Sequence, residues 1–326
     1  MDIQNAKEFR EDGTVQRYVD ILTNGGFKAL FGDIANKEVV MSIINVLLPD
    51  HRKVKDIDYL PTERQGQLTE INKEYHYDFM CRDESGAMFI VELQRYKDDY
   101  WFKRCVSYAC RAYDRQNRKG SDYDVPPVYL IGLMDVEVDH PDKDFWKNRY
   151  VSEYTFREKL SHDLLGETIV IIFAEMANFT KRLEECVSDT DKMLYVLKNI
   201  GKMMNQPGWL QHEIYTRLFD ACEIAGFTED KRIEYEKIMY DEKRLKSEME
   251  TARRIGYSDG HKEGLAAGHA EGHAEGRAEG RAEGLMEGLM EGLTEVAKQM
   301  LADGMPADKI ATYTKLSIEE IKSLQV

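Results

Sequence analysis

Two carboxylates that lie in apolar, strand-like sequence are the residues best placed to do chemistry. Alternation along residues 87–94 puts Glu92 and Gln94 on the same face of a strand. Asp78 lies in the preceding strand-like segment, residues 75–82, and a turn between the two segments brings it close to Glu92. Unpaired carboxylates are costly in apolar surroundings, and two like charges this close call for a divalent cation between them. We therefore expect an Mg²⁺ site here, with Mn²⁺ or Ca²⁺ as alternatives.

A basic segment that follows the second strand has aromatic residues interleaved with its bases. Residues 95–119 contain eight bases and three acids, 8 − 3 = +5, in a chain whose net charge is −15. Helical spacing of three and four places one set of residues on a common face: Trp101, Arg104, Tyr108, Arg111 and Arg115. We interpret the four residues after Trp101 as a DNA-binding face, because arginines and aromatics beside a metal site suit contacts to phosphates. The alternative is a helix that covers the core while its arginines extend to solvent.

The elements that position these residues follow the order α-β-β-α-β. Residues 39–48 have the apolar spacing of an amphipathic helix, and residues 98–118 return to helical spacing after the hairpin. Residues 128–135 read as a buried strand, and residues 168–174 read as a further strand of the same sheet. The pattern predicts an α/β fold, a mixed sheet flanked by helices, over residues 1–177.

A glycine array separates the two ends of the chain. Glycine recurs at every fourth position from Gly256 to Gly292, so that ten of the 23 glycines share one register. A period of four does not match 3.6 residues per turn, and each interior glycine costs about 1 kcal/mol in a helix. We interpret residues 251–292 as a spacer, either a marginal helix or a semi-flexible tether, that follows a helical extension at 178–250. Residues 293–326 show three short helical units with a helix-turn-helix outline, which suits DNA contact or homo-oligomerisation but is also found in tails without a binding role.

Composition excludes several classes of protein and indicates a compartment. No apolar run approaches the roughly 20 residues that a membrane helix needs, so we expect no membrane contact. Five cysteines without a CxxC pair argue against a disulfide framework and a cysteine-ligated zinc site. Sixty acids against 45 bases disfavour a protein that coats nucleic acid through bulk charge. The opening segment MDIQNAKEFRED has no basic head before an apolar stretch, so we expect a cytoplasmic protein.

Several segments together resemble the recombination-promoting nuclease and transposase branch of the PD-(D/E)xK nuclease superfamily. They are FKALFG, the hairpin with Asp78 and Glu92-Leu93-Gln94, and the C-terminal MLADGMPADKIATYTKLSIEEI; the likeness runs over residues 17–135 and resumes in that last segment. The resemblance implies a restriction-endonuclease-like core, one or two divalent cations and hydrolysis of DNA phosphodiester bonds. It also implies that Asp78, Glu92 and the backbone carbonyl of Leu93 hold the metal. Gln94 would occupy the place of the superfamily lysine.

Two positions depart from that family pattern, and two further residues have open roles. Gln94 replaces the superfamily lysine, as is common in this branch, with an amide that orients groups by hydrogen bonds and carries no charge. Asn24 stands where the family usually has an aspartate, and a neutral oxygen there would weaken binding of a second metal. Lys28 either reaches the site or is a solvated helix residue. His76 either serves as a nearby base or occupies an ordinary strand position.

The sequence therefore predicts a metal-dependent DNA endonuclease linked to recombination or mobile elements. Asp78, Glu92 and Gln94 are its predicted catalytic residues. One alternative is a DNA-binding protein built on a weakened nuclease fold, and another is a transposition accessory protein whose partner cuts. Without the resemblance, the same three residues also fit an edge-strand group that faces solvent or is hydrogen-bonded to neighbouring backbone.

Overall fold

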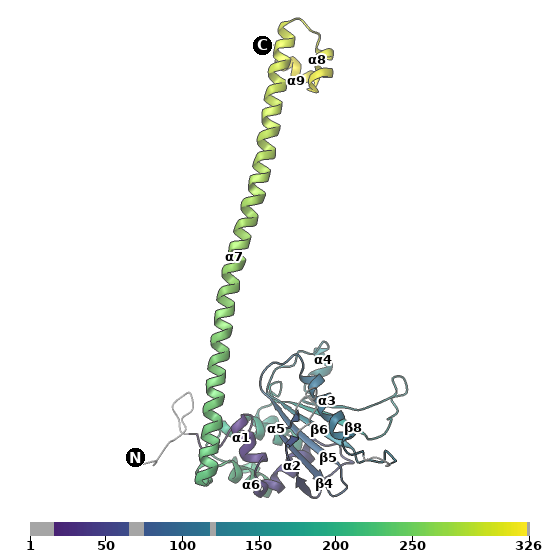
Figure 1. Cartoon of the computed structure of the whole chain (residues 1–326), viewed down its shortest axis with the longest axis vertical. Helices are drawn as coiled ribbons and strands as arrows, with labels where there is room; N and C mark the ends of the chain where they lie inside the picture. Colours follow the sequence, from purple (N-terminus) through teal and green to yellow (C-terminus); the bar gives the residue numbers. More distant parts are fainter. Residues whose placement is uncertain (1–15, 65–74, 118–121, 325–326) are drawn as a thin grey trace, which may run out of the picture. The chain divides into compact units, whose positions relative to one another are not determined.

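The computed structural model describes residues 16–64, 75–117 and 122–324. The described chain divides into two compact units at Arg244, and the long helix α7 (Glu229–Ala302) contributes to both (Figure 1). The predicted opening segment and the bases Arg118 and Lys119 lie outside the described residues. Within the described ranges, no helix is both long and apolar enough to cross a bilayer.

The first unit is built on a mixed sheet, as predicted. Its described strands pair in the order β1-β4-β5-β6-β8-β7, with β5, β6 and β8 parallel and the other pairs antiparallel. The strands are β1 (Ile57–Tyr59), β4 (Phe79–Asp83), β5 (Met88–Gln94), β6 (Val128–Met134), β7 (Val151–Tyr154) and β8 (Ile169–Glu175). A separate described pair joins β2 (Glu63–Arg64) and β3 (Tyr75–His76). The central strands β5 and β6 are buried along their length, which explains why their sequences are apolar apart from Glu92 and Gln94 in β5.

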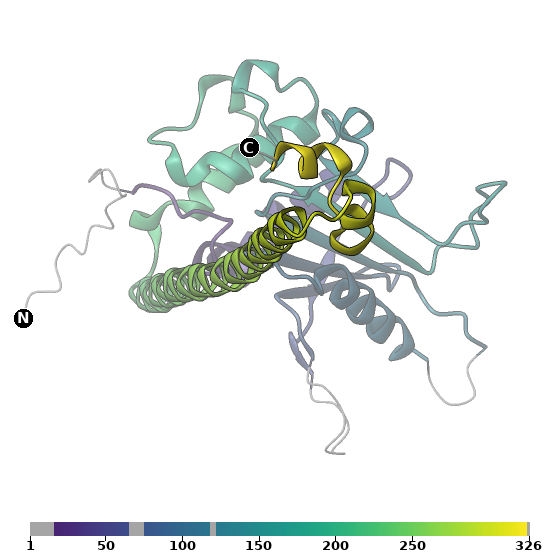
Figure 2. The same cartoon turned by 90° about the horizontal axis from the view of Figure 1, so that it is seen from above.

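Helices cover both faces of this sheet (Figures 1 and 2). One face packs against α1 (Asn24–Phe31), α2 (Lys37–Leu47), α5 (Asp189–Asn199), α6 (Glu213–Cys222) and the start of α7. The other face packs against α3 (Trp101–Asp114) through a smaller apolar cluster. The remaining short helices of this unit are η1 (Ile34–Asn36), α4 (Lys143–Trp146), η2 (Leu183–Glu185), η3 (Ile200–Lys202), η4 (Gly208–Leu210) and η5 (Ile224–Gly226).

The start of α1 depends on two glycines that allow close packing. Thr23 caps the helix, because its hydroxyl oxygen accepts from the Gly26 backbone N–H at 3.0 Å. A Cβ on Gly26 would lie 1.9 Å from the Asp20 carbonyl oxygen, and a Cβ on Gly25 would lie 2.9 Å from the Met239 sulfur. Glycine is therefore required at Gly26, where a Cβ would meet backbone, whereas a Cβ at Gly25 would displace the Met239 side chain of α7.

The hairpin that carries the predicted carboxylates is present, but its first strand is shorter than expected. Residues 75–82 do not form one strand, because the chain bends between β3 and β4. The Tyr77 N–H donates to the Thr62 carbonyl at 3.1 Å, and the Asp78 N–H donates to the Glu92 carboxylate at 3.2 Å. These bonds replace the ladder of a continuous strand, so Asp78 lies immediately before β4.

The second unit ends in a small helical module. Its helices α8 (Ala307–Thr314) and α9 (Ile318–Ser323) pack with the end of α7 around an apolar cluster. The members of this cluster are Ala297, Ile310, Leu316 and Ile321. Ser317 and Glu320 form a reciprocal capping box at the start of α9.

The glycine array lies within α7, and we expect this helix to be marginal there. Every array glycine from Gly256 to Gly292 faces open space, so no described contact offsets the cost of glycine in a helix. A peptide of residues 256–292 should therefore show little helicity in water by circular dichroism. A stable, concentration-independent helix would contradict this prediction.

Candidate active site

Asp78 and Glu92 meet across the hairpin at the end of β5. Phe79 pairs with Val91 in the ladder, so the next positions outward are Asp78 and Glu92. The Asp78 N–H donates to Glu92 Oε1 at 3.2 Å, and the Leu93 N–H donates to Asp78 Oδ2 at 2.8 Å. Each carboxylate thus accepts a backbone hydrogen bond from the partner strand, which fixes the pair in place.

Burial makes this carboxylate pair electrostatically costly. Glu92 is 3% exposed, whereas Asp78 is an exposed residue whose carboxylate accepts from the Leu93 N–H. Burial raises the pKa of Glu92 well above its ordinary value, and the nearby Asp78 charge raises that pKa further. Atoms packed around the Asp78 carboxylate raise its pKa as well. A cation bound between the two carboxylates would therefore allow both to be ionised at the same time.

The oxygen ligands available at Asp78, Glu92 and Leu93 suit a metal ion that binds only a few protein groups. In the described part of the chain, no cluster of three or more His, Cys, Asp or Glu side chains could hold a metal. Asp78 and Glu92 supply two carboxylates, and the Leu93 carbonyl is the candidate third protein oxygen. Mg²⁺ commonly binds through one or two carboxylates and completes its shell with water and substrate phosphate. The residues present are compatible with that arrangement.

The raised pKa values predict a pH-dependent stability in metal-free protein. A carboxyl group whose pKa is higher in the folded than in the unfolded chain stabilises the fold below the unfolded pKa. That contribution is lost as pH rises through the folded pKa. The melting temperature in EDTA should therefore fall as pH rises above about 4.3, the ordinary glutamate pKa. Calorimetry of the wild type and of Glu92→Gln measures this, and equal slopes for the two proteins would contradict it.

Gln94 is linked to helix α3 through Arg104. The Gln94 side chain is 7% exposed, its Nε2 donates to the Tyr96 carbonyl, and its Oε1 accepts from Arg104 Nη2 at 2.8 Å. Arg104 Nη1 donates to Asp98 at 2.8 Å, and its guanidinium lies 4.9 Å from the centroid of the Trp101 ring. The third predicted catalytic residue is thus held in a fixed orientation.

The other predicted DNA-binding residues line one side of α3. Tyr108 packs edge-on against Tyr77 with ring centroids 5.1 Å apart, and burial raises its pKa to about 12. Arg111 lies 3.9 Å from Asp114, and Arg115 borders an open cavity of about 330 Å³. These side chains are half-buried, so they lie between the covered and the fully exposed sides of the helix.

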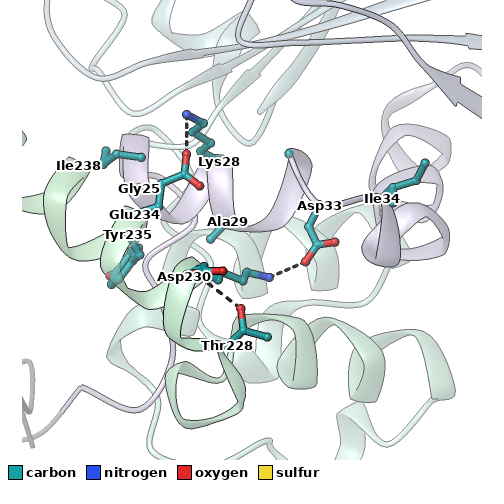
Figure 3. A pocket seen from close by; sticks show the side chains of 12 residues that line it. Gly25, Lys28, Ala29, Asp33, Ile34, Thr228, Asp230, Glu234, Tyr235 and Ile238 are labelled. Atoms are coloured by element: carbon teal, nitrogen blue, oxygen red, sulfur yellow. Dashed lines mark hydrogen bonds and ion pairs between the residues drawn. The ribbon is translucent and has the colours of Figure 1, made fainter. Parts of the chain in front are cut away.

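Asn24 and the two residues with open roles, Lys28 and His76, lie in different surroundings. The Asn24 backbone N–H donates to Glu242 of α7 at 3.2 Å. Lys28 is exposed and forms a 2.8 Å ion pair with Glu234 across a groove of about 470 Å³ between α1 and α7 (Figure 3). This contact agrees with a solvated helix residue. His76 is exposed in β3, outside the sheet that carries Glu92.

Sequence patterns missed one polar contact beside the site. Glu242 is 7% exposed, and it pairs with Arg95, which immediately follows Gln94. It also accepts from the Asn24 N–H, 218 positions earlier in the chain. No local spacing could have revealed this link. A glutamate inside a helix is ordinary, and its importance comes from the packing of α7 on α1.

Comparison with known proteins identifies one family that this chain matches. A family model described as PD-(D/E)XK nuclease family transposase matches residues 22–252. The match covers the sheet, the carboxylate pair and the first part of α7. No curated protein and no solved structure matches the chain.

Proposed function

The chain belongs to the PD-(D/E)XK nuclease family transposases, and we propose that it is a metal-dependent DNA endonuclease. The observation that carries this proposal is the reciprocally bonded pair Asp78 and Glu92 at the end of β5, beside Gln94. Such a pair matches the metal-binding half of the family motif. The proposed substrate is DNA, with Mg²⁺ as cofactor and Mn²⁺ or Ca²⁺ as alternatives.

The chain's own groups have distinct tasks in this proposal. Asp78, Glu92 and the Leu93 carbonyl would hold the ion, and a bound ion would supply a water molecule of lowered pKa and a positive charge close to the phosphate. Gln94 Oε1 has two lone pairs, and Arg104 occupies one. The other can accept a hydrogen bond from the attacking water and orient it toward phosphorus.

Nicking of supercoiled plasmid tests the proposal. The purified full-length protein should convert supercoiled to relaxed DNA with Mg²⁺ and should not do so in EDTA. Binding of the same plasmid is measured in parallel by electrophoretic mobility. DNA binding without metal-dependent nicking would favour the alternative, a DNA-binding or transposition accessory protein on a weakened nuclease fold. Asn24, a neutral amide where the family has a carboxylate, is the feature that favours this alternative.

We expect Arg111 and Arg115 to contact DNA phosphates along α3. Replacing either with alanine should weaken binding similarly for all sequences and lower the salt slope, d log K/d log[salt], by about 0.9. Fluorescence anisotropy with two unrelated duplexes over a salt series measures both effects. Arg217→Ala is the matched control, because Arg217 belongs to α6 on the opposite face of the sheet. An unchanged slope would mean that these arginines only cover the core.

Self-association through the C-terminal region is a further part of the proposal. The end of the array exposes Leu285 at 76%, Met286 at 68% and Leu289 at 61%. Exposed apolar side chains this close together are typical of an interaction surface. Sedimentation of the full chain and of a chain that ends at Glu250 should show a larger assembly for the full chain only.

A further inference from the structure

The PD-(D/E)XK motif has a lysine at the position that Gln94 occupies in this chain, so strand β5 brings no positive charge to the site. We propose that Arg104 of α3 supplies this charge and positions it through Gln94. The inference rests on the proposed nuclease function, and it gives Arg104 a different task from the phosphate contact predicted by its helical spacing.

The contact geometry carries this inference. Arg104 Nη2 donates to Gln94 Oε1 at 2.8 Å, which joins the guanidinium directly to the residue in the lysine position. Gln94 cannot simply rotate away, because its Nε2 donates to the Tyr96 carbonyl. Glu92 and Gln94 share the face of β5 that packs against α3, since both alternate with residues of the opposite core. The positive charge therefore lies on the same side of the sheet as the carboxylates.

Neighbouring groups hold the guanidinium before any ligand arrives. Asp98 accepts from Arg104 Nη1 at 2.8 Å, and its other oxygen accepts from the Tyr100 N–H at 2.8 Å. Trp101 is 2% exposed, and its ring lies 4.9 Å from the Arg104 guanidinium carbon. A planar, permanently charged group with several fixed partners loses little freedom when the substrate binds. This is the arrangement expected of a preorganised charge.

The charge also acts on both carboxylates. Arg104 contacts Gln94, which lies two positions after Glu92 on the same face of β5, so its charge lies close to the carboxylate pair. A cation that interacts with both carboxylates must repel a metal ion bound between them. Arg104 should therefore weaken metal binding while it stabilises negative charge on the phosphate. A residue that only ties α3 to β5 would not produce these opposite effects.

Calorimetric titration with Ca²⁺ alone, without DNA, tests the repulsion. At a pH high enough for both carboxylates to be ionised in the metal-free protein, Arg104→Gln should bind Ca²⁺ about three- to tenfold more tightly than the wild type, because one positive charge is removed. The Glu92→Gln protein defines the heat from other acidic sites and is subtracted. Lys103→Gln is the matched control, since Lys103 is the exposed neighbour on the same helix and should leave Ca²⁺ affinity unchanged.

Plasmid nicking with Mg²⁺ tests the catalytic half. Arg104→Gln should lower the nicking rate about a hundredfold, the typical effect of losing one charge-stabilising group. Arg104→Lys should retain more activity than Arg104→Gln. In the double variant Gln94→Lys with Arg104→Gln, a lysine on β5 should restore the rate at least about tenfold. Circular dichroism melting confirms that each variant is folded.

The outcomes separate this inference from the proposed function. Tighter Ca²⁺ binding by Arg104→Gln together with an inactive wild type would support the position of the charge and reject the nuclease. Unchanged or weaker Ca²⁺ binding by a folded Arg104→Gln would overturn the inference, whatever the wild type cleaves. Loss of DNA binding in EDTA without a change in Ca²⁺ affinity would make Arg104 a phosphate contact and would also overturn it.

Discussion

Glu92→Gln is expected to abolish Mg²⁺-dependent nicking, by at least about a thousandfold, and to stabilise the fold. The glutamine side chain keeps an oxygen that can accept from the Asp78 N–H, so the hairpin contact survives. It removes a buried carboxylate whose pKa is raised well above the ordinary value by burial and by Asp78. Loss of a buried like charge should raise the free energy of unfolding by about 1 kcal/mol or more near neutral pH.

Two measurements on one preparation check this prediction. Plasmid nicking gives the rate, and urea denaturation followed by circular dichroism gives the free energy of unfolding. Glu153→Gln is the matched control, because Glu153 is an exposed glutamate on β7 of the same sheet. If rigorously purified Glu92→Gln still nicks the plasmid, the assignment of Glu92 to the active site is wrong. Equal losses of activity and stability would show that Glu92 acts on the fold rather than on the reaction.

The centre of the sheet could be predicted because its sequence signals are local and strong. Strands β5, β6 and β8 are apolar runs bounded by turns, and burial on both faces produces this pattern. The hairpin turn could be predicted from Gly86, which has φ +87. Helix α2 ends at Leu47, because the proline at position 49 disfavours helical backbone in the residue before it.

The outer strands carried no comparable signal. Strand β7 (Val151–Tyr154) is partly exposed and has only four residues, so its sequence resembles that of a loop. Strand β1 (Ile57–Tyr59) has three residues and pairs with β4 from a distant part of the chain. Such short edge strands are defined by the neighbour that completes their hydrogen bonds. Local propensity cannot reveal them.

In the candidate site, too, contacts within one hairpin could be predicted and contacts between distant elements could not. The meeting of Asp78 with Glu92 follows from a hairpin, whose register depends on nearby residues. The contact of Arg104 with Gln94 did not follow, because helical spacing fixes which residues share a face and not which strand that face meets. The contacts of Glu242 could not be predicted from the sequence either, because they depend on how α7 packs against α1.

A chain that ends at Thr228 is expected to lose most of the stability of the first unit. The start of α7 supplies Tyr235, which is 2% exposed in the main core, and Met239, which packs against that core. Truncation of one buried aromatic side chain costs about 3–5 kcal/mol. The loss of Tyr235 alone is thus a large part of the roughly 5–15 kcal/mol that stabilises a typical domain.

The same truncation removes polar contacts that no other element replaces. Glu242 pairs with Arg95 and accepts from the Asn24 N–H, and Lys231 pairs with Asp33 at 2.8 Å. Arg95 would keep a half-buried charge without this partner, which adds to the cost. A chain that ends at Glu250 retains all of these contacts and loses only residues outside the main core. Its urea midpoint should match that of the first transition of the full chain, whereas the shorter chain should unfold at a much lower midpoint or aggregate. Equal midpoints for the two truncated chains would show that α7 is an appendage and that the nuclease unit ends before it begins.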